Sequence, residues 1–469
     1  MKLDIHKFHT VFTIFIFVAL ASLDHAVIGL FPPLFTSISS DLNINIASLG
    51  LISAVSYFVI SLSSVIWGYL ADKGKRRRLI MIGTVLWSIS VFLTAYSHSF
   101  AELMFAQIIT GIGLGCIGSI GYSVLSDYIP YKWRGTLMSL WGMSQGFGGI
   151  AGSLMASIVA TETNWRKPFL IIAVLGLVFT FLYLFIKEPV KGASEPELQN
   201  LVKEGFEYNY SIDLSQIGKI ISKRSNLWLM LQGFFLNTTT GTLIWLPTLY
   251  ASKIEKLGYN LSTAIIASGY LFALFQLGGL FSMYFGYIGD KLQKRTDRGR
   301  ALLGAASIFT AMPLYILMFS IPLKTLSLPD NGSPVSIFWR IIDQLTFHPN
   351  LGFIVMFLLA IGATAAQSAN IPNWLALLTD VNLPEHRATA FSIANLISGA
   401  GRAFGNAFIG VVLTLAGRHL PEPYNYVITM SIFQLFFLPA VFCYLKVSRT
   451  GTRDMKFVRL KLKRRSRLN

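Results

Sequence analysis

Long runs of apolar residues follow one another along this chain, separated by short polar intervals. A helix needs about 20 mainly apolar residues to cross the hydrocarbon core of a bilayer. Twelve runs are long enough, and they lack the two-residue alternation of transmembrane strands. The pattern therefore predicts an all-α polytopic membrane protein. The predicted spans cover residues 11–36, 47–70, 79–97, 100–126, 135–160, 168–187, 226–252, 262–288, 300–322, 351–378, 387–415 and 424–446.

The composition supports this interpretation. Of 469 residues, 53% are hydrophobic and only 13% are charged, against a usual charged fraction of about 25%. So few charges cannot coat the surface of soluble domains of this total length. The first apolar run is too long for a signal-peptide core and no small-residue cleavage site follows it, so we expect it to stay as a span.

The basic residues that give the net charge of +17 lie in short runs between the spans. This distribution predicts how the chain is oriented in the membrane, and it does not favour nucleic-acid binding. Alternate loops and the two ends carry 31 lysines and arginines, and the opposite loops carry seven. We therefore expect both termini to be cytoplasmic, in a multi-pass plasma or inner membrane. The expected parts are an N-terminal six-helix bundle over 1–187, a cytoplasmic central loop over 188–225, a C-terminal six-helix bundle over 226–446 and a basic cytoplasmic tail over 447–469.

Two segments outside the spans have amphipathic patterns, 211–221 in the central loop and 334–346 in the loop before the tenth span. Each is expected to form a helix at the membrane surface. The simplest role of the basic tail is to anchor the chain on anionic lipid.

The two halves of the chain repeat each other. Gly68-Tyr69-Leu70-Ala71-Asp72-Lys73 returns as Gly286-Tyr287-Ile288-Gly289-Asp290-Lys291, 218 residues later. A second echo has an offset of 253 residues and keeps seven positions in register. Two six-helix halves are a transporter architecture. The seven pairs are Asp127 and Asp380, Arg134 and Arg387, Thr136 and Thr389, Ser139 and Ser392, Gly146 and Gly399, Gly148 and Gly401, and Gly152 and Gly405.

On these residues the whole chain resembles the major facilitator superfamily. The stretch from Gly68 to Arg77 is similar to that family's signature between its second and third helices. The resemblance implies two pseudo-symmetric six-helix bundles and charge clusters that latch the cytoplasmic side. The alternative is a plain turn with topology charges. The implied gate residues are Gly68, Asp72, Arg76, Asp127, Arg134, Gly286, Asp290, Asp380 and Arg387.

Within that superfamily the first span is similar to that of spinster-type lipid carriers, which also have an aspartate followed by a basic residue, here Asp24-His25. Other positions depart from the pattern. Gln107 stands where those carriers have a basic residue, and Phe147 replaces the proline of the antiporter signature.

Three ionisable residues lie well inside predicted spans: Asp24, His25 and Arg402. Each costs about 2.5–3.5 kcal/mol on insertion scales and therefore calls for an explanation. Asp24 is interpreted as a proton site, with His25 tuning or sharing the proton. Arg402 is interpreted as the residue that captures a carboxylate or phosphate group. The alternatives are a structural ion pair or hydrogen bonds between helices.

Neutral polar residues predict a central cavity. Gln367, Asn370 and Trp374 share one face of the tenth span. For each of these residues, interhelical hydrogen bonding is the alternative. The other candidates for the cavity lining are Tyr57, Gln145, Asn237 and Gln276.

The sequence favours a secondary active transporter working by alternating access, with a proton as coupling ion and a small organic anion as substrate. An exporter of amphiphiles, lysolipids or drugs is the second hypothesis, and a non-transporting receptor the third. No Walker-type loop, metal-ligand cluster or nucleophile–base pair occurs in the spans, so we expect no enzyme activity and no cofactor. The expected environment is the lipid bilayer, with the chain as a monomer and without nucleic acid.

Overall fold

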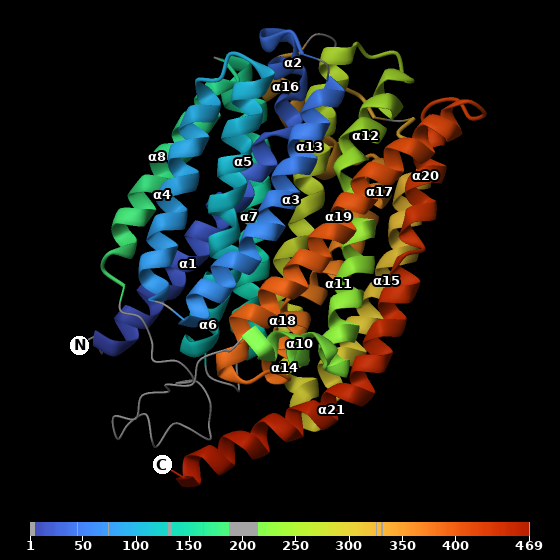
Figure 1. Cartoon of the computed structure of the whole chain (residues 1–469). Helices are drawn as coiled ribbons and strands as arrows, with labels where there is room; N and C mark the ends of the chain where they lie inside the picture. Colours follow the sequence, from blue (N-terminus) through green and yellow to red (C-terminus); the bar gives the residue numbers. More distant parts are fainter. Residues whose placement is uncertain are drawn as a thin grey trace.

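The computed structural model describes residues 5–44, 46–73, 75–129, 134–162, 164–186, 214–324, 326–329 and 332–468. Long helices run roughly alongside one another in two groups, with α3 and α19 adjacent where the groups meet (Figure 1). The first group comprises α1 (Ile5–Leu30), η1 (Pro32–Leu34), α2 (Phe35–Leu42), α3 (Ile46–Lys73), α4 (Arg76–Ala95), α5 (Phe100–Cys116), η2 (Ile117–Gly121), α6 (Tyr122–Tyr128), α7 (Arg134–Glu162) and α8 (Arg166–Tyr183).

The second group begins with a short helix that lies at the end of the bundle where both termini are found (Figure 1). It comprises α10 (Leu214–Ser222), α11 (Arg224–Thr242), η4 (Leu243–Trp245), α12 (Leu246–Glu255), α13 (Leu261–Phe275), η5 (Gln276–Phe281), α14 (Ser282–Arg295), α15 (Gly299–Ser320), α16 (Pro334–Thr346), α17 (Leu351–Ser368), α18 (Asn370–Asp380), η6 (Pro384–His386), α19 (Arg387–Gly417), α20 (Tyr424–Gln434) and α21 (Phe437–Leu468).

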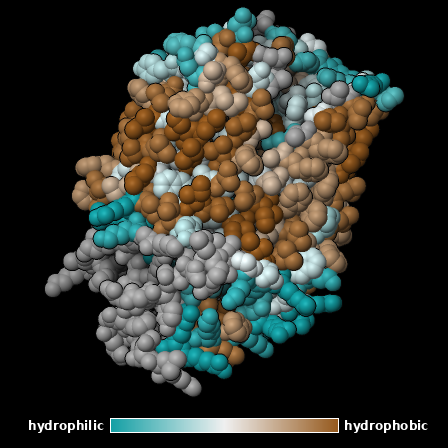
Figure 2. Space-filling view, in the orientation of Figure 1, coloured by the Kyte–Doolittle hydropathy of each residue, from teal (hydrophilic) through white to brown (hydrophobic). Residues whose placement is uncertain are grey.

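The membrane interpretation is confirmed. Ten described helical stretches are long and apolar enough to cross a bilayer. The other two predicted spans are also helical: α7 is the fifth, and α11 with η4 and α12 is the seventh. Apolar side chains cover the middle of the face seen in Figure 2, and hydrophilic ones gather at its two ends. Large apolar side chains such as Phe15 (58% exposed) and Ile66 (59% exposed) point outward, as contact with lipid tails requires.

Glycines of the repeat explain the closest helix pair in each half. A Cβ on Gly148 of α7 would lie 2.1 Å from the Ser22 carbonyl oxygen on α1. A Cβ on Gly401 of α19 would lie 2.2 Å from the Phe234 carbonyl oxygen on α11. No side chain fits at either place. The two glycines are equivalent in the repeat because each half contains the same close contact between two helix backbones. The next repeat pair, Gly152 and Gly405, makes equivalent approaches to Ala26 and Thr238.

Five spans are interrupted partway through. A π-helical turn joins α5 to α6, and 3₁₀ turns join α11 to α12 and α13 to α14. The tenth span is broken between α17 and α18, at Ala369, and the twelfth is broken between α20 and α21, at Leu435 and Phe436. Interruptions of this kind are tolerated inside a bilayer where protein or a cavity surrounds the freed backbone groups. The apolar pattern predicts none of these breaks.

The two halves meet along two contact lines. In the first, α3 packs against α19, and a Cβ on Gly399 would lie only 1.8 Å from the Ser61 hydroxyl oxygen. In the second, α7 packs against α13, η5, α14 and α18. Gly146 and Gly399, which are equivalent in the repeat, therefore both lie at the boundary between the halves.

Several boundaries differ from the predicted ones. The first span ends at Leu30, because a turn and then Pro32 and Pro33 prevent the helix from continuing. By contrast, the helix predicted over 334–346 is confirmed with the same bounds, as α16. The basic tail is part of α21, which begins at Phe437 inside the twelfth predicted span and runs to Leu468. Of the central loop, residues 187–213 lie outside the described residues.

Candidate functional site

Arg402 lies where helices from both halves converge. It follows the start of α19 by 15 residues, which is about 22 Å of helix and near mid-depth. Its Nη2 donates a hydrogen bond to Oδ1 of Asn237 on α11, at 3.3 Å. Its Cζ lies 5.5 Å from the ring centroid of Tyr57 on α3, within reach of a cation–π interaction. The guanidinium thus joins an amide from its own half to an aromatic ring from the other.

His25 adds a third element to this group. It lies on α1, and the charge of Arg402 acts on its imidazole. Gly148 of α7 allows α1 to approach closely here, because a Cβ at Gly148 would lie 2.7 Å from the Cβ of His25. His25, Tyr57, Asn237 and Arg402 are all partly exposed, and we refer to these four as the Arg402 cluster.

Asp24 precedes His25, but among the described residues it makes no ion pair with Arg402. Its side chain is only 7% exposed. Its Oδ1 is buried and has no hydrogen-bond partner among the described residues. A buried carboxylate oxygen without a partner is costly, so this position needs an explanation beyond packing.

The polar residues of the tenth span bond within the second half. The Oδ1 of Asn370 accepts hydrogen bonds from Tyr444 at 2.6 Å and from Gln232 at 2.9 Å. Trp374 donates to the Leu229 carbonyl oxygen at 3.0 Å. These contacts are the interhelical hydrogen bonds that the sequence left as the alternative. Gln367 is held in the same way, by the hydroxyl of Tyr315.

Two further candidates lie on the contact line of α7. Gln276 opens the 3₁₀ turn η5, and its Oε1 is the atom nearest to where a Cβ on Gly149 would lie. Its Nε2 is buried without a partner among the described residues. Gln145 belongs to α7, but its side chain lies outside what the structure describes.

The predicted gate residues lie at the end of the bundle that carries the termini. Arg76, at the start of α4, pairs with Asp127 of α6 at 2.7 Å, and both side chains are buried. In the second half, Arg300 bridges Asp290 at 2.7 Å and Asp380. Three more of the predicted gate residues are buried, and they lie close in sequence to members of the two clusters: Gly68, Gly286 and Arg387. The side chains of Asp72 and Arg134 lie outside the described residues.

Arg300 is the residue that sequence reasoning missed. It opens the ninth span, as Arg76 opens the third, and it takes two carboxylates of the repeat as partners. The signal was available, because a basic residue begins the third helix of each half. The echo in sequence letters ends at Lys291, however, nine residues before Arg300.

The chemistry open to the Arg402 cluster is recognition of an anion. Arg402 has five N–H donors, and among the described residues the amide oxygen of Asn237 is the one side-chain acceptor that they bond. Within the described part of the chain, no group of three His, Cys, Asp or Glu side chains is placed to hold a metal ion. The cluster therefore offers a fixed positive charge, an amide and an aromatic ring.

Comparison with known proteins agrees with this architecture. The sequence profile described as "Major Facilitator Superfamily" matches residues 14–341. The Drosophila melanogaster protein spinster is 29% identical over 34% of this chain, and the match spans only 27% of the fly protein. The cis,cis-muconate transport protein of Acinetobacter baylyi is 21% identical over 66% of this chain and 73% of its own length.

A solved structure shows the same fold. The proton:xylose symporter XylE, bound to 6-bromo-6-deoxy-D-glucose, superimposes with a TM-score of 0.63 at 16% identity. The alignment covers 92% of this chain and 94% of that one. Twelve spans in two pseudo-symmetric bundles are therefore the architecture of this chain.

Proposed function

Because the chain belongs to the major facilitator superfamily, we propose that it is a secondary active transporter of a small organic anion. The two six-helix halves rock about the Arg402 cluster, so that the site opens alternately to the two sides of the membrane. The positive-inside rule assigns the termini-bearing end to the cytoplasm. The buried ion pairs of Arg76 and Arg300 at that end then belong to the cytoplasmic gate.

One observation carries this proposal: Arg402 contacts elements of both halves. Asn237 belongs to the second half, whereas Tyr57 belongs to the first. A ligand that pairs with the guanidinium would contact parts that move relative to each other, so its binding would be coupled to the rocking motion. Its carboxylate would take two parallel hydrogen bonds from the planar guanidinium.

The names of relatives favour the same substrate class. The muconate transport protein is named for an organic dianion, and other relatives are named as benzoate and sulfoacetate transporters. All three are small organic anions. The symporter XylE adds precedent for proton coupling on this fold.

Asp24 is our candidate for the coupling proton site. A buried carboxyl whose Oδ1 lacks a partner costs less when it carries a proton. His25, the next residue, lies in the field of Arg402.

Binding tests the substrate class most simply. Purified protein in detergent is screened by thermal shift with matched pairs, each a carboxylate and its amide, such as benzoate with benzamide and muconate with muconamide. We expect carboxylates to raise the melting temperature and amides to have no effect. Arg402→Gln should weaken binding about 10- to 100-fold, because a charge-assisted hydrogen bond is worth about 1.5–3 kcal/mol. Stabilisation by lysolipids and not by carboxylates would instead favour the amphiphile exporter.

The proton role has its own test. In proteoliposomes, Asp24→Asn should abolish accumulation driven by a proton gradient but leave counterflow exchange intact, because exchange needs no net proton movement. Unchanged pH dependence of uptake in this variant would reject Asp24 as the coupling site and leave the anion site untouched.

A further inference from the structure

The basic tail is a helix docked on the second half of the bundle. Beyond the twelfth span, α21 buries Met455, Val458 and Leu462, which are 1%, 3% and 0% exposed. Arg465 pairs with Glu385 at 2.9 Å, and both side chains are largely buried. Burial at three consecutive turns and this ion pair fix the helix against the loop that follows α18. One face of α21 is therefore already occupied.

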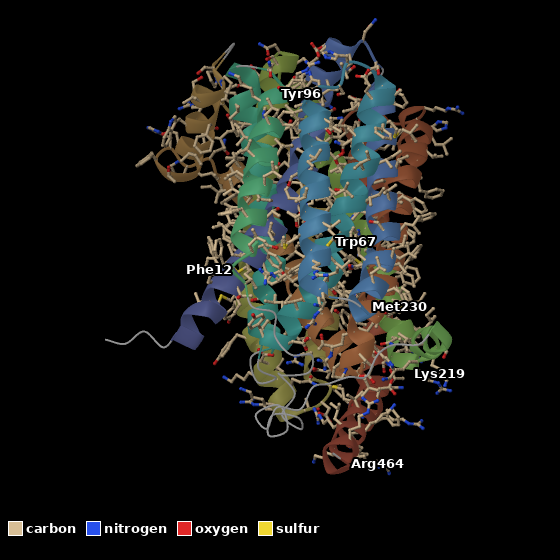
Figure 3. The ribbon with its side chains drawn as sticks, turned by 60° about the vertical axis from the view of Figure 1, so that its left-hand side comes forward. Phe12, Trp67, Tyr96, Lys219, Met230 and Arg464 are labelled. Atoms are coloured by element: carbon tan, nitrogen blue, oxygen red, sulfur yellow. The ribbon has the colours of Figure 1, made fainter. Side chains whose placement is uncertain are left out.

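The opposite face of α21 is exposed and has an unusual composition. Successive residues turn by about 100° around a helix, which places Arg453, Phe457, Leu460 and Arg464 opposite the buried stripe. Phe457 is 57% exposed and Leu460 is 60% exposed. Arg464 lies near the free end of α21, at the bottom of the molecule (Figure 3). Two large apolar side chains thus stand among arginines with nothing in the described chain covering them. We call this the outer face of α21, formed by Arg449, Arg453, Lys456, Phe457, Leu460 and Arg464.

The chain contains a segment with the complementary composition. Residues 187–213 carry six of the 22 acidic residues of the protein and only three basic ones. The tail, 447–469, carries nine basic residues and one acidic residue. The acidic segment also has apolar and aromatic residues among its charges, including Leu201, Phe206 and Tyr208.

We propose that the acidic segment 187–213 binds the outer face of α21. Its carboxylates would pair with the arginines, and its apolar residues would cover Phe457 and Leu460. The segment is tethered at Ile186 and Leu214, so binding is intramolecular and has an effective concentration in the millimolar range. Its 27 residues reach about 90 Å when extended, which is ample for the distance along one face of the bundle.

The geometry favours this occupant over an anionic bilayer. The buried stripe of α21 packs toward the bundle, so the outer face is directed away from it. A helix that bound the membrane surface would bury its apolar residues in lipid. Here Phe457 and Leu460 are on the side away from the body that the bilayer surrounds.

Cysteine cross-linking tests the proposal, since both native cysteines are buried. Phe206→Cys is paired with Leu460→Cys in the full-length protein, in uncharged micelles and in vesicles containing 30% phosphatidylglycerol. The matched control pairs Phe206→Cys with Tyr96→Cys, which is 56% exposed at the other end of the bundle. We expect a cross-link only for Leu460→Cys, in both environments, with a yield that falls several-fold at 1 M salt.

Charge reversal distinguishes a specific complex from chance encounter. Arg453→Glu with Arg464→Glu should lower the cross-link yield about tenfold, and adding Glu204→Lys with Glu207→Lys should restore it. The proposal is overturned if the Leu460→Cys yield does not exceed the Tyr96→Cys control. Loss of the cross-link in anionic vesicles would also overturn it, because the outer face would then serve lipid. The salt titration needs no charge variants, so it remains informative if the reversed protein does not fold.

Discussion

At the scale of single residues, the position of Arg402 inside a span carries a free-energy cost that needs an explanation. A permanent cation inside a span is expensive unless something offsets its desolvation. Among the described residues it has an amide oxygen and an aromatic face as partners, and no carboxylate within ion-pair distance. Neither partner cancels its charge. The remaining charge is what makes the cluster suited to an anionic ligand.

The ring of Tyr57 should contribute to this site through its face. Tyr57→Phe keeps the ring, so we expect ligand affinity within about twofold of the original. Tyr57→Leu removes the cation–π partner and should weaken binding about two- to fivefold, corresponding to about 0.5–1 kcal/mol. Isothermal titration with the best carboxylate from the screen measures both. Equal losses for the two variants would show that the hydroxyl, and not the ring, matters.

Arg300 should be the most sensitive position at the termini-bearing end. Removing it leaves Asp290 and Asp380 facing each other in a buried site. Breaking a buried ion pair by deleting one partner costs about 3–5 kcal/mol. Arg300→Gln should therefore lower the melting temperature in detergent by many degrees. Arg298→Gln, which changes an exposed residue two positions earlier, serves as the control and should change little.

At the scale of elements, the contact between α11 and α19 depends on glycine. A Cβ on Gly405 would lie 2.1 Å from the Thr238 carbonyl oxygen, and backbone cannot yield as a flexible side chain would. Gly405→Ala should therefore cost about 1–3 kcal/mol, the usual range for overpacking. Gly410, on the same helix, has nothing within 4 Å of its potential Cβ. Thermal unfolding of the two alanine variants compares them directly, and equal stability would refute the close-packing argument.

The short element η6 should make stability depend on pH. Burial lowers the pKa of His386 from its usual 6.5; Glu385 opposes the shift, while Lys461, Lys223 and Arg465 add to it. On acidification the unfolded chain takes up this proton before the folded chain does, so stability falls as pH drops below 6.5. Melting curves between pH 7.5 and 5.5 should show this slope, and His386→Gln should reduce it. An unchanged slope would assign the effect to other groups.

The elements also show where sequence reasoning succeeds. Segment length and hydropathy predict the helices, because every segment that crosses the bilayer must be both long enough and apolar enough to do so. The breaks at η2 and η5 could not be predicted from the sequence, because a π-helical or 3₁₀ turn has the same apolar composition as the helix around it. The partners of Asn370 and Gln367 could not be predicted either. Tyr444 and Tyr315 come from other spans, and only the packing brings them within hydrogen-bond distance.

At the scale of the whole molecule, the repeat organises both structure and proposed mechanism. Gly148 and Gly401 bring α7 against α1 and α19 against α11, whereas Gly146 and Gly399 face the opposite half. One pattern therefore builds each bundle and the boundary between them. Arg402 has no counterpart in the repeat, since the equivalent position 253 residues earlier is Gly149. The two halves are therefore similar in their packing, but only the second half supplies a charged residue at this position. This is the arrangement expected of a binding site at the boundary between the halves.

Uptake of a labelled carboxylate into proteoliposomes under an imposed proton gradient tests the central claim most directly. The account predicts accumulation above the external concentration by the unaltered protein. It also predicts loss of both accumulation and counterflow in Arg402→Gln, with the melting temperature of the unliganded variant close to that of the unaltered protein. Accumulation by Arg402→Gln at the unaltered rate would contradict the account.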